Sequence, residues 1–149
     1  MDTVTYPEIG DVPGVAPVRL NVMKERDAAK RLDARWTPTF IFMDAQERQA
    51  HRFMGYHPPA EFVAQVQLAR GHAGFAFGDT AGGLAAFEAV EAPEFKPEAM
   101  YWAGVCRFKL EKSTQPIYDA CREIVEKYPD HFWAKKVGFV TKYRDFNIS

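Results

Sequence analysis

An apolar run entered through a proline constrains the fold of this chain more than any other stretch of its sequence. Residues 36–44 read Trp-Thr-Pro-Thr-Phe-Ile-Phe-Met-Asp. β-Branched and aromatic residues suit the pleated, packed surface of a sheet, so Thr39 to Met43 is expected to form a buried strand that Asp44 closes. Pro38 has no N–H to donate to a ladder, so it is expected at the first residue of this strand or just before it.

Strand-like and helix-like segments alternate on both sides of this run. Val15 to Val22 alternates apolar with polar residues, which predicts a strand, whereas Lys24 to Trp36 carries an apolar stripe at helical spacing. Downstream, Arg52 to Tyr56 is a second strand candidate, and Pro59 to Arg70 is a helix candidate with proline in its first turn. The expected order of elements is therefore strand–helix–strand–strand–helix.

This order resembles the C-terminal two-thirds of a thioredoxin-fold domain. The resemblance is carried by Pro17 to Val22, by Trp36 to Thr39, and by Arg52 to Pro59. Together these segments cover roughly residues 1–70. In the thioredoxin family, the Thr-Pro pair belongs to a loop that lies against a Cys-x-x-Cys motif, and this chain contains no such motif.

The resemblance implies a role for the loop around Pro38. It implies that the Thr37–Pro38 peptide bond is cis, and that Trp36, Thr37 and Pro38 form a loop that contacts the backbone of a substrate in related proteins. Disulfide exchange requires an attacking thiolate. Without the motif cysteines, the loop is expected to bind a substrate but not to exchange its disulfides.

The same resemblance leaves a gap in the predicted sheet. In the thioredoxin fold, the strand before the Cys-x-x-Cys lies between the strands that correspond here to Val15–Val22 and Thr39–Met43. Unpaired ladders are unfavourable, because each buried unsatisfied backbone group costs about 1–3 kcal/mol. We therefore expect these two strands to pair directly. The alternatives are insertion of Met1–Tyr6 and borrowing of a strand from another copy.

From about Gly71 onward the sequence pattern is helical. Two helical pairs follow each other at a spacing of about 35–40 residues, which is similar to the tetratricopeptide repeat. This resemblance places Ala103-Gly104 at the small packing pair of a repeat, and Lys135 to Tyr143 as a helix that caps the last pair. The predicted fold class is α/β: an incomplete thioredoxin-like lobe over residues 1–70, followed by an all-α tetratricopeptide-like lobe over residues 71–149.

Aromatic side chains are concentrated in the second helical pair. Tyr101, Trp102, Phe108 and Tyr118 lie close together in the predicted helices. Such a cluster is most simply part of the core. The alternative is a concave groove for a peptide, because helical-repeat surfaces bind extended segments and Tyr and Trp are enriched at interfaces. Tyr101, Trp102 and Tyr118 are therefore candidate partner-binding residues.

Composition and spacing argue against several functional classes. The 149 residues carry a formal net charge of −1, whereas nucleic-acid binding requires clustered excess of Lys and Arg. No apolar run approaches the ~20 residues that span a bilayer, and the N-terminus lacks signal-peptide features, so we expect a cytoplasmic protein without a membrane role. The four histidines and two cysteines show no ligand spacing. We expect neither a metal nor another cofactor.

Three functional hypotheses follow. The first is a redox-inactive binding or scaffold protein with a protein or peptide partner. The second is a thiol-disulfide oxidoreductase whose Cys-x-x-Cys is encoded upstream of a misplaced start, and the third is a helical-repeat interaction protein. Cys106 and Cys121 are interpreted as packing residues, with a redox pair as the alternative. Exposed strand edges would also permit a homo-oligomer, and the sequence leaves open whether the chain is an enzyme.

Overall fold

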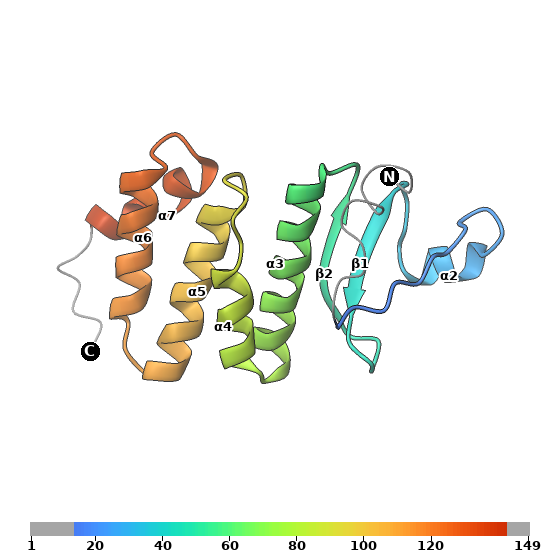
Figure 1. Cartoon of the computed structure of the whole chain (residues 1–149), viewed down its shortest axis with the longest axis horizontal. Helices are drawn as coiled ribbons and strands as arrows, with labels where there is room; N and C mark the ends of the chain where they lie inside the picture. The colour runs from blue at the N-terminus through green and yellow to red at the C-terminus, as the bar shows by residue number, and fades with distance from the viewer. Residues whose placement is uncertain (1–13, 143–149) are drawn as a thin grey trace.

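The computed structural model describes residues 14–142, which form a two-stranded sheet with one short helix on its outer side and a stack of helices on the other (Figure 1). The strands are β1 (Thr39–Met43) and β2 (Gln49–Met54). The helices are α2 (Arg26–Arg31), α3 (Pro59–Phe77), α4 (Thr80–Glu88), α5 (Lys96–Glu111), α6 (Gln115–Lys127) and α7 (Phe132–Lys142). The described part of the chain is therefore mostly helical.

The hairpin confirms the strand predicted at Thr39–Met43. The two strands are antiparallel, and Phe40 pairs with Phe53 in the register. Asp44 organises the turn, because one oxygen of its carboxylate, Oδ1, accepts hydrogen bonds from the backbone N–H of Gln46 (3.0 Å) and of Arg48 (2.8 Å). An Asx-type turn of this kind replaces the Asn-Gly or Asp-Gly signal of shorter hairpins.

One face of the hairpin packs on α3. Phe53, Phe62 and Val66 are buried together there, with Phe40 and Phe42 packed against them. This contact explains how a sheet of two short strands persists, since an isolated hairpin is marginal and needs a packed face. The opposite face of the sheet carries Arg52 and Met54 and turns toward α2.

The strand predicted at Val15–Val22 is not formed. No strand is assigned to residues 15–22, and β1 pairs only with β2 within residues 14–142. The expected direct pairing with Thr39–Met43 is therefore wrong. Alternation produces a strand only where a neighbouring ladder and an apolar layer receive it. Val18 has neither, because its residue surface is 83% exposed.

The helix predicted over Lys24–Trp36 is much shorter than expected. It covers only Arg26–Arg31, and none of its residues is buried. Asp33 takes a positive φ of 49°, which ends the helix. The Arg52 guanidinium donates hydrogen bonds to the carbonyl oxygens of Leu32 and Asp33 at this end, where a positive charge is favourable. A residue about twenty positions away in sequence thus satisfies carbonyl groups at the end of the helix.

α3 spans the position of the predicted boundary between the two lobes. This helix runs without a break through residues 70 and 71, where the sequence analysis placed a boundary between lobes. Its first part contacts the sheet through Phe62. Its later part packs on α4, where Leu68 and Phe87 join one buried cluster. The sheet and the helical region are therefore built on the same helix.

Close contacts between helices occur at glycines. A Cβ atom added to Gly74 of α3 would lie 2.6 Å from Gly83 Cα of α4, and one added to Gly104 of α5 would lie 2.9 Å from Ala120 Cβ of α6. Small residues permit such an approach of two backbones. The contact predicted at Ala103-Gly104 is confirmed, and both residues are buried.

Candidate functional site

Backbone and side-chain hydrogen bonds hold the loop that enters β1. The Thr37–Pro38 peptide bond is cis, as the resemblance implied. The hydroxyl of Thr39 donates to the carbonyl oxygen of Trp36 (2.5 Å), and the N–H of Gly55 donates to the carbonyl oxygen of Pro38 (2.9 Å). Gly55 has a φ of 90°, which glycine adopts without a steric penalty. The loop is therefore fixed against the end of β2.

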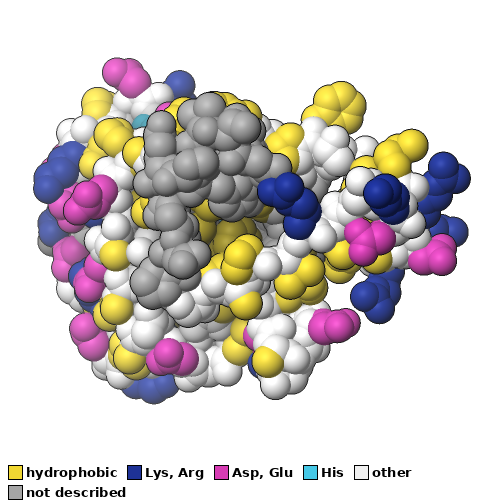
Figure 2. All heavy atoms as spheres, turned by 45° about the vertical axis from the view of Figure 1, so that its right-hand side comes forward, with side chains coloured by type: hydrophobic (Ala, Val, Ile, Leu, Met, Phe, Trp, Pro, Cys, Tyr) yellow, Lys and Arg dark blue, Asp and Glu magenta, His cyan; other side chains and the backbone are white. Residues whose placement is uncertain are grey.

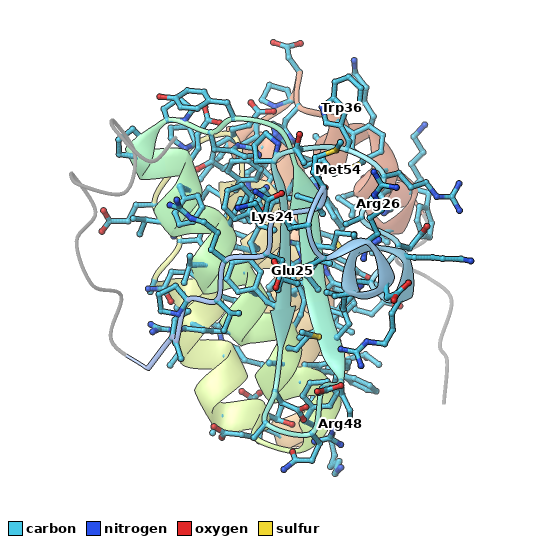
Figure 3. The ribbon with its side chains drawn as sticks, turned by 90° about the vertical axis from the view of Figure 1, so that its right-hand side faces the viewer. Lys24, Glu25, Arg26, Trp36, Arg48 and Met54 are labelled. Atoms are coloured by element: carbon cyan, nitrogen blue, oxygen red, sulfur yellow. The ribbon has the colours of Figure 1, made fainter. Side chains whose placement is uncertain are left out.

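Exposed apolar side chains surround this loop. Trp36 is 68% exposed, and Met54 and Tyr56 are more than half exposed. Met54 lies opposite Thr39 in the strand register, next to Pro38. Trp36 and Met54 lie at the same end of the hairpin, opposite the Arg48 turn (Figure 3). We call Trp36, Pro38, Met54 and Tyr56 the cis-proline surface.

Met54 and Tyr56 were missed as site residues by the sequence analysis. For Met54 the signal is the period of two in a strand: because Phe53 points toward α3, Met54 points to the other face. Their position next to Pro38 depends on the register between β1 and β2. The two residues became recognisable only once that register was known.

An aromatic cluster supports the cis-proline surface from below. The rings of Phe40 and Phe53 are stacked with centroids 4.7 Å apart, and Phe62 meets Phe40 edge to face at 5.1 Å. His57, next to Tyr56, contacts Phe53 at 4.9 Å and lies 3.1 Å from Glu61 Oε2. Aromatic pairs in these geometries contribute about 0.5–1.5 kcal/mol beyond their burial. The exposed residues of the cis-proline surface therefore lie next to a tightly packed aromatic cluster.

The surface near this loop combines apolar and basic groups. Hydrophobic side chains are visible between the body of the molecule and its α2 end, and Lys and Arg side chains gather at that end (Figure 2). Exposed large apolar residues here include Val18, Leu20 and Met23. Contiguous exposed apolar surface often marks an interaction site.

The two cysteines lie away from the aromatic cluster under Pro38. Cys106 is buried in the cluster formed by α3, α4 and α5, whereas Cys121 is buried in the cluster formed by α5, α6 and α7. Both are free thiols. Burial raises the pKa of the Cys106 thiol and that of the Cys121 thiol above the usual value. These features are typical of packing cysteines.

The candidate partner residues of the helical region lie in different environments. Trp102 packs against Phe87 and His72, and the ring centroids of Trp102 and His72 are 4.9 Å apart. The Tyr101 ring instead contacts the Trp133 ring, with centroids 5.2 Å apart. The Tyr101 and Trp102 rings touch each other at 5.7 Å. Tyr118 is half-buried on α6. Tyr101 and Trp102 thus belong mainly to the two helical cores.

A groove of about 420 Å³ lies over α5, between α4 and α6, and the three aromatic candidates do not line it. Its floor is formed by small or flexible side chains such as Ala99, Met100 and Ala103. Its rim carries charges of both signs, including an ion pair between Arg107 and Glu88. Because the rim carries charges of both signs, it does not indicate whether a ligand would be positively or negatively charged.

Two histidines meet where the sheet joins the helical region. His51 Nε2 lies 2.7 Å from Gln65 Oε1, and His72 Nε2 lies 3.8 Å from Glu98 Oε1. Burial lowers the pKa of His51; the hydrogen bond with Gln65 opposes this effect, and the charge of His72 adds to it. Within residues 14–142, no three His, Cys, Asp or Glu side chains are placed to hold a metal ion.

Comparisons with known proteins give one match. Residues 4–70 match the family model described as a thioredoxin-like domain. This match supports a thioredoxin-like domain that includes the sheet, the cis-proline surface and the first part of α3. No curated protein and no solved structure matches the chain. Between residues 14 and 142, no helix is both long enough and apolar enough to cross a membrane.

Proposed function

We propose that this chain is a protein- or peptide-binding module that uses the cis-proline surface and, as the chain stands, has no disulfide-exchange activity. The observation that carries the proposal is the exposure of Trp36, Met54 and Tyr56 around a cis Thr37–Pro38 bond on a rigid base. Tyr and Trp are frequent anchors of interfaces. The lack of exchange activity is inferred from the two cysteines, which are buried in other clusters.

A binding experiment with an extended polypeptide tests this function. The probe is the reduced and carboxymethylated B chain of insulin, titrated into the 15N-labelled protein. Amide shifts are expected at Trp36, Met54 and Tyr56. Trp36→Ala should weaken binding about tenfold or more, since hot-spot aromatics contribute 2 kcal/mol or more. Phe108→Ala, which changes an exposed aromatic residue of α5, is the matched control.

Two outcomes would contradict the proposal. If the shifts cluster elsewhere, or if Trp36→Ala and Phe108→Ala weaken binding equally, the cis-proline surface is not the binding site. Faster reduction of native insulin by dithiothreitol in the presence of the purified chain than in its absence would contradict the redox-inactive part, and loss of this acceleration in Cys106→Ser would assign the activity to the helical region. The oxidoreductase hypothesis would then replace the binding hypothesis.

We further propose that α3 to α7 form a tetratricopeptide-like arrangement that serves protein binding in the cytoplasm. Gly71, Gly104 and Gly138 lie on α3, α5 and α7 and are 33 and 34 residues apart, close to the period of about 34 in tetratricopeptide repeats. Small residues at this interval match the packing position assigned to Ala103-Gly104. Insertion of two residues after Lys112 changes the spacing between repeats. Amide hydrogen exchange should then become faster in α6 and α7 and stay unchanged in the β1–β2 hairpin.

A further inference from the structure

The exposed side of α7 carries aromatic, basic and glycine residues at helical spacing. The packing of α7 on the rest of the stack does not require these residues. Its buried side contacts the rest of the stack through Ala134 and Val137. Its outer face consists of Phe132, Lys135, Gly138, Phe139 and Lys142, which we call the α7 outer face. Four of these residues follow the i, i+3, i+4, i+7 pattern of a helix face that meets another helix. The residue surfaces of Phe132 and Phe139 are 68% and 60% exposed.

Two glycines of the earlier helices, at the repeat spacing proposed above, are covered by a neighbouring helix. At Gly71 of α3 the space of a side chain is filled by the ring of Phe87 from α4. At Gly104 of α5 it is filled by Ala120 Cβ and the Pro116 carbonyl from α6, at 2.9 and 3.0 Å. At Gly138 of α7, no atom of the described chain lies within 4 Å of an added Cβ. Among residues 14–142, no helix covers on α7 the position at which a helix packs on α3 and α5.

The arrangement of the stack indicates the shape that fits this position. α4 lies alongside α3 and α6 alongside α5, each joined to its neighbour by a short connection (Figure 1). α6 and α7 together form the end of the described stack farthest from the sheet (Figure 1). A helix that packed across Gly138 would stand to α7 as α6 stands to α5, with Phe132 and Phe139 beside its apolar stripe.

Charge indicates the composition of that helix. Phe132–Lys142 contains three lysines and no acidic residue. Two copies of α7 would bring like charges together, which disfavours pairing of this face with itself. We propose that the α7 outer face binds an amphipathic helix of a partner protein that carries acidic residues beside an apolar stripe. This site is separate from the cis-proline surface, and it rests on the tetratricopeptide-like arrangement of α3 to α7 proposed above.

An anionic membrane is the other surface that attracts a basic amphipathic helix. The glycine argues for a protein helix instead. A lipid surface gains from added apolar area, so it would be bound better when Gly138 is replaced by leucine. A helix that approaches closely at Gly138 would be excluded by the same replacement. The two occupants therefore predict opposite effects of one substitution.

The test uses the full chain and a synthetic helix of defined composition. The probe is an 18-residue fluorescent peptide with Leu and Ala along one face and Glu on both flanks, with a Lys-flanked peptide as its charge control. Anisotropy titration should show saturable binding of the Glu peptide only, with amide shifts along α7. Gly138→Leu and the pair Lys135→Glu, Lys142→Glu should each weaken it about tenfold or more.

Matched variants distinguish an effect at the α7 outer face from a general effect of added bulk or reversed charge. Ala81→Leu places a leucine at an exposed position of α4, and the pair Lys30→Glu, Arg31→Glu reverses charge on α2; neither should change binding. Phe139→Ser provides a second disruption if Gly138→Leu fails to fold. Trp36→Ala should leave this binding unchanged, which separates the site from the cis-proline surface.

Several results would overturn the proposal. These are absence of saturable binding, equal binding of the Lys-flanked peptide, and equal weakening by the control variants. Vesicles of phosphatidylcholine and phosphatidylserine provide the last comparison. If the protein binds these vesicles, Gly138→Leu strengthens that binding and the Glu peptide does not compete, α7 is a membrane-surface helix and the protein-helix proposal is wrong.

Discussion

The imidazole ring of His51 on β2 stacks on that of His72 on α3, with ring centroids 5.4 Å apart and an angle of 18° between the planes. The pair lies where the sheet meets the helical region. Gln65 contacts His51, and Glu98 of α5 faces His72. These four residues connect the sheet to both α3 and α5. Since α3 supports the cis-proline surface as well, this contact links the two parts of the molecule.

The pair predicts that stability falls on acidification. Burial lowers the pKa of His51 in the folded state, so below the unfolded value of about 6.5 the unfolded chain binds a proton more readily than the folded one. The stability contributed by neutral His51 is therefore present above pH 6.5 and is lost as pH falls through the lower folded pKa. Urea unfolding between pH 5 and 7.5 should show this loss.

The control for this prediction changes an exposed residue that does not titrate. His51→Gln should reduce the dependence of the unfolding midpoint on pH, whereas Gln49→Asn, on the same strand, should not. If both variants keep the pH dependence of the parent protein, His51 is not its source.

The contact at Gly104 predicts a difference between two glycine substitutions. Gly104→Leu should destabilise the fold by about 1–3 kcal/mol or more, because the added side chain meets Ala120 and the backbone of Pro116. Gly138→Leu is the matched control, since no described atom lies near that position. Thermal unfolding should therefore show a lower Tm only for the Gly104 variant, and equal melting of both would contradict the close α5–α6 contact.

The local pattern of residues 36–43 was enough to predict both the strand and its entry. β-Branched and aromatic residues indicated β1, and the Trp-Thr-Pro-Thr resemblance indicated the cis bond. Helical spacing likewise indicated α3, α5 and α6, because their apolar stripes are complete within each segment. Features whose cause lies within a few residues were accessible from the sequence.

Features that depend on distant contacts were not accessible in this way. The alternation in Val15–Val22 predicted a strand, but among the described residues no neighbouring strand pairs with this segment. The end of α2 depends on Arg52, which is about twenty residues away. Tyr101 and Trp102 had a groove and a core as alternatives, and their orientation toward Trp133 and Phe87 follows from the packing of α5. In each case the partner, not the segment itself, decides the structure.

The environment of the cysteines predicts slow modification in the native protein. Cys106 and Cys121 are fully buried, and burial raises the pKa of both thiols, so little thiolate is exposed at neutral pH. Reaction with Ellman's reagent should be slow without denaturant and should reach two thiols per chain in urea. Fast reaction of either cysteine in the native protein would show that its cluster opens readily.

The outer edge of β1 predicts concentration-dependent self-association. The hydrogen bond from Gly55 N to Pro38 O identifies Thr39–Met54 as a non-hydrogen-bonded pair of the ladder. Thr39 and Ile41 therefore direct their backbone N–H and C=O groups away from β2. Within residues 14–142, no strand pairs with that side. An exposed edge of this kind is a template for another strand.

Charge on this edge should suppress the association. Met43→Lys places a lysine at the end of β1, and natural edge strands use lysine to prevent pairing. Val63→Lys on α3 is the matched control, because both native residue surfaces are 42% exposed. Sedimentation velocity over a hundredfold range of concentration should show association of the parent protein and of Val63→Lys, but less association of Met43→Lys. A parent protein that stays monomeric throughout, or equal suppression by both variants, would mean that the β1 edge is not used for association between copies.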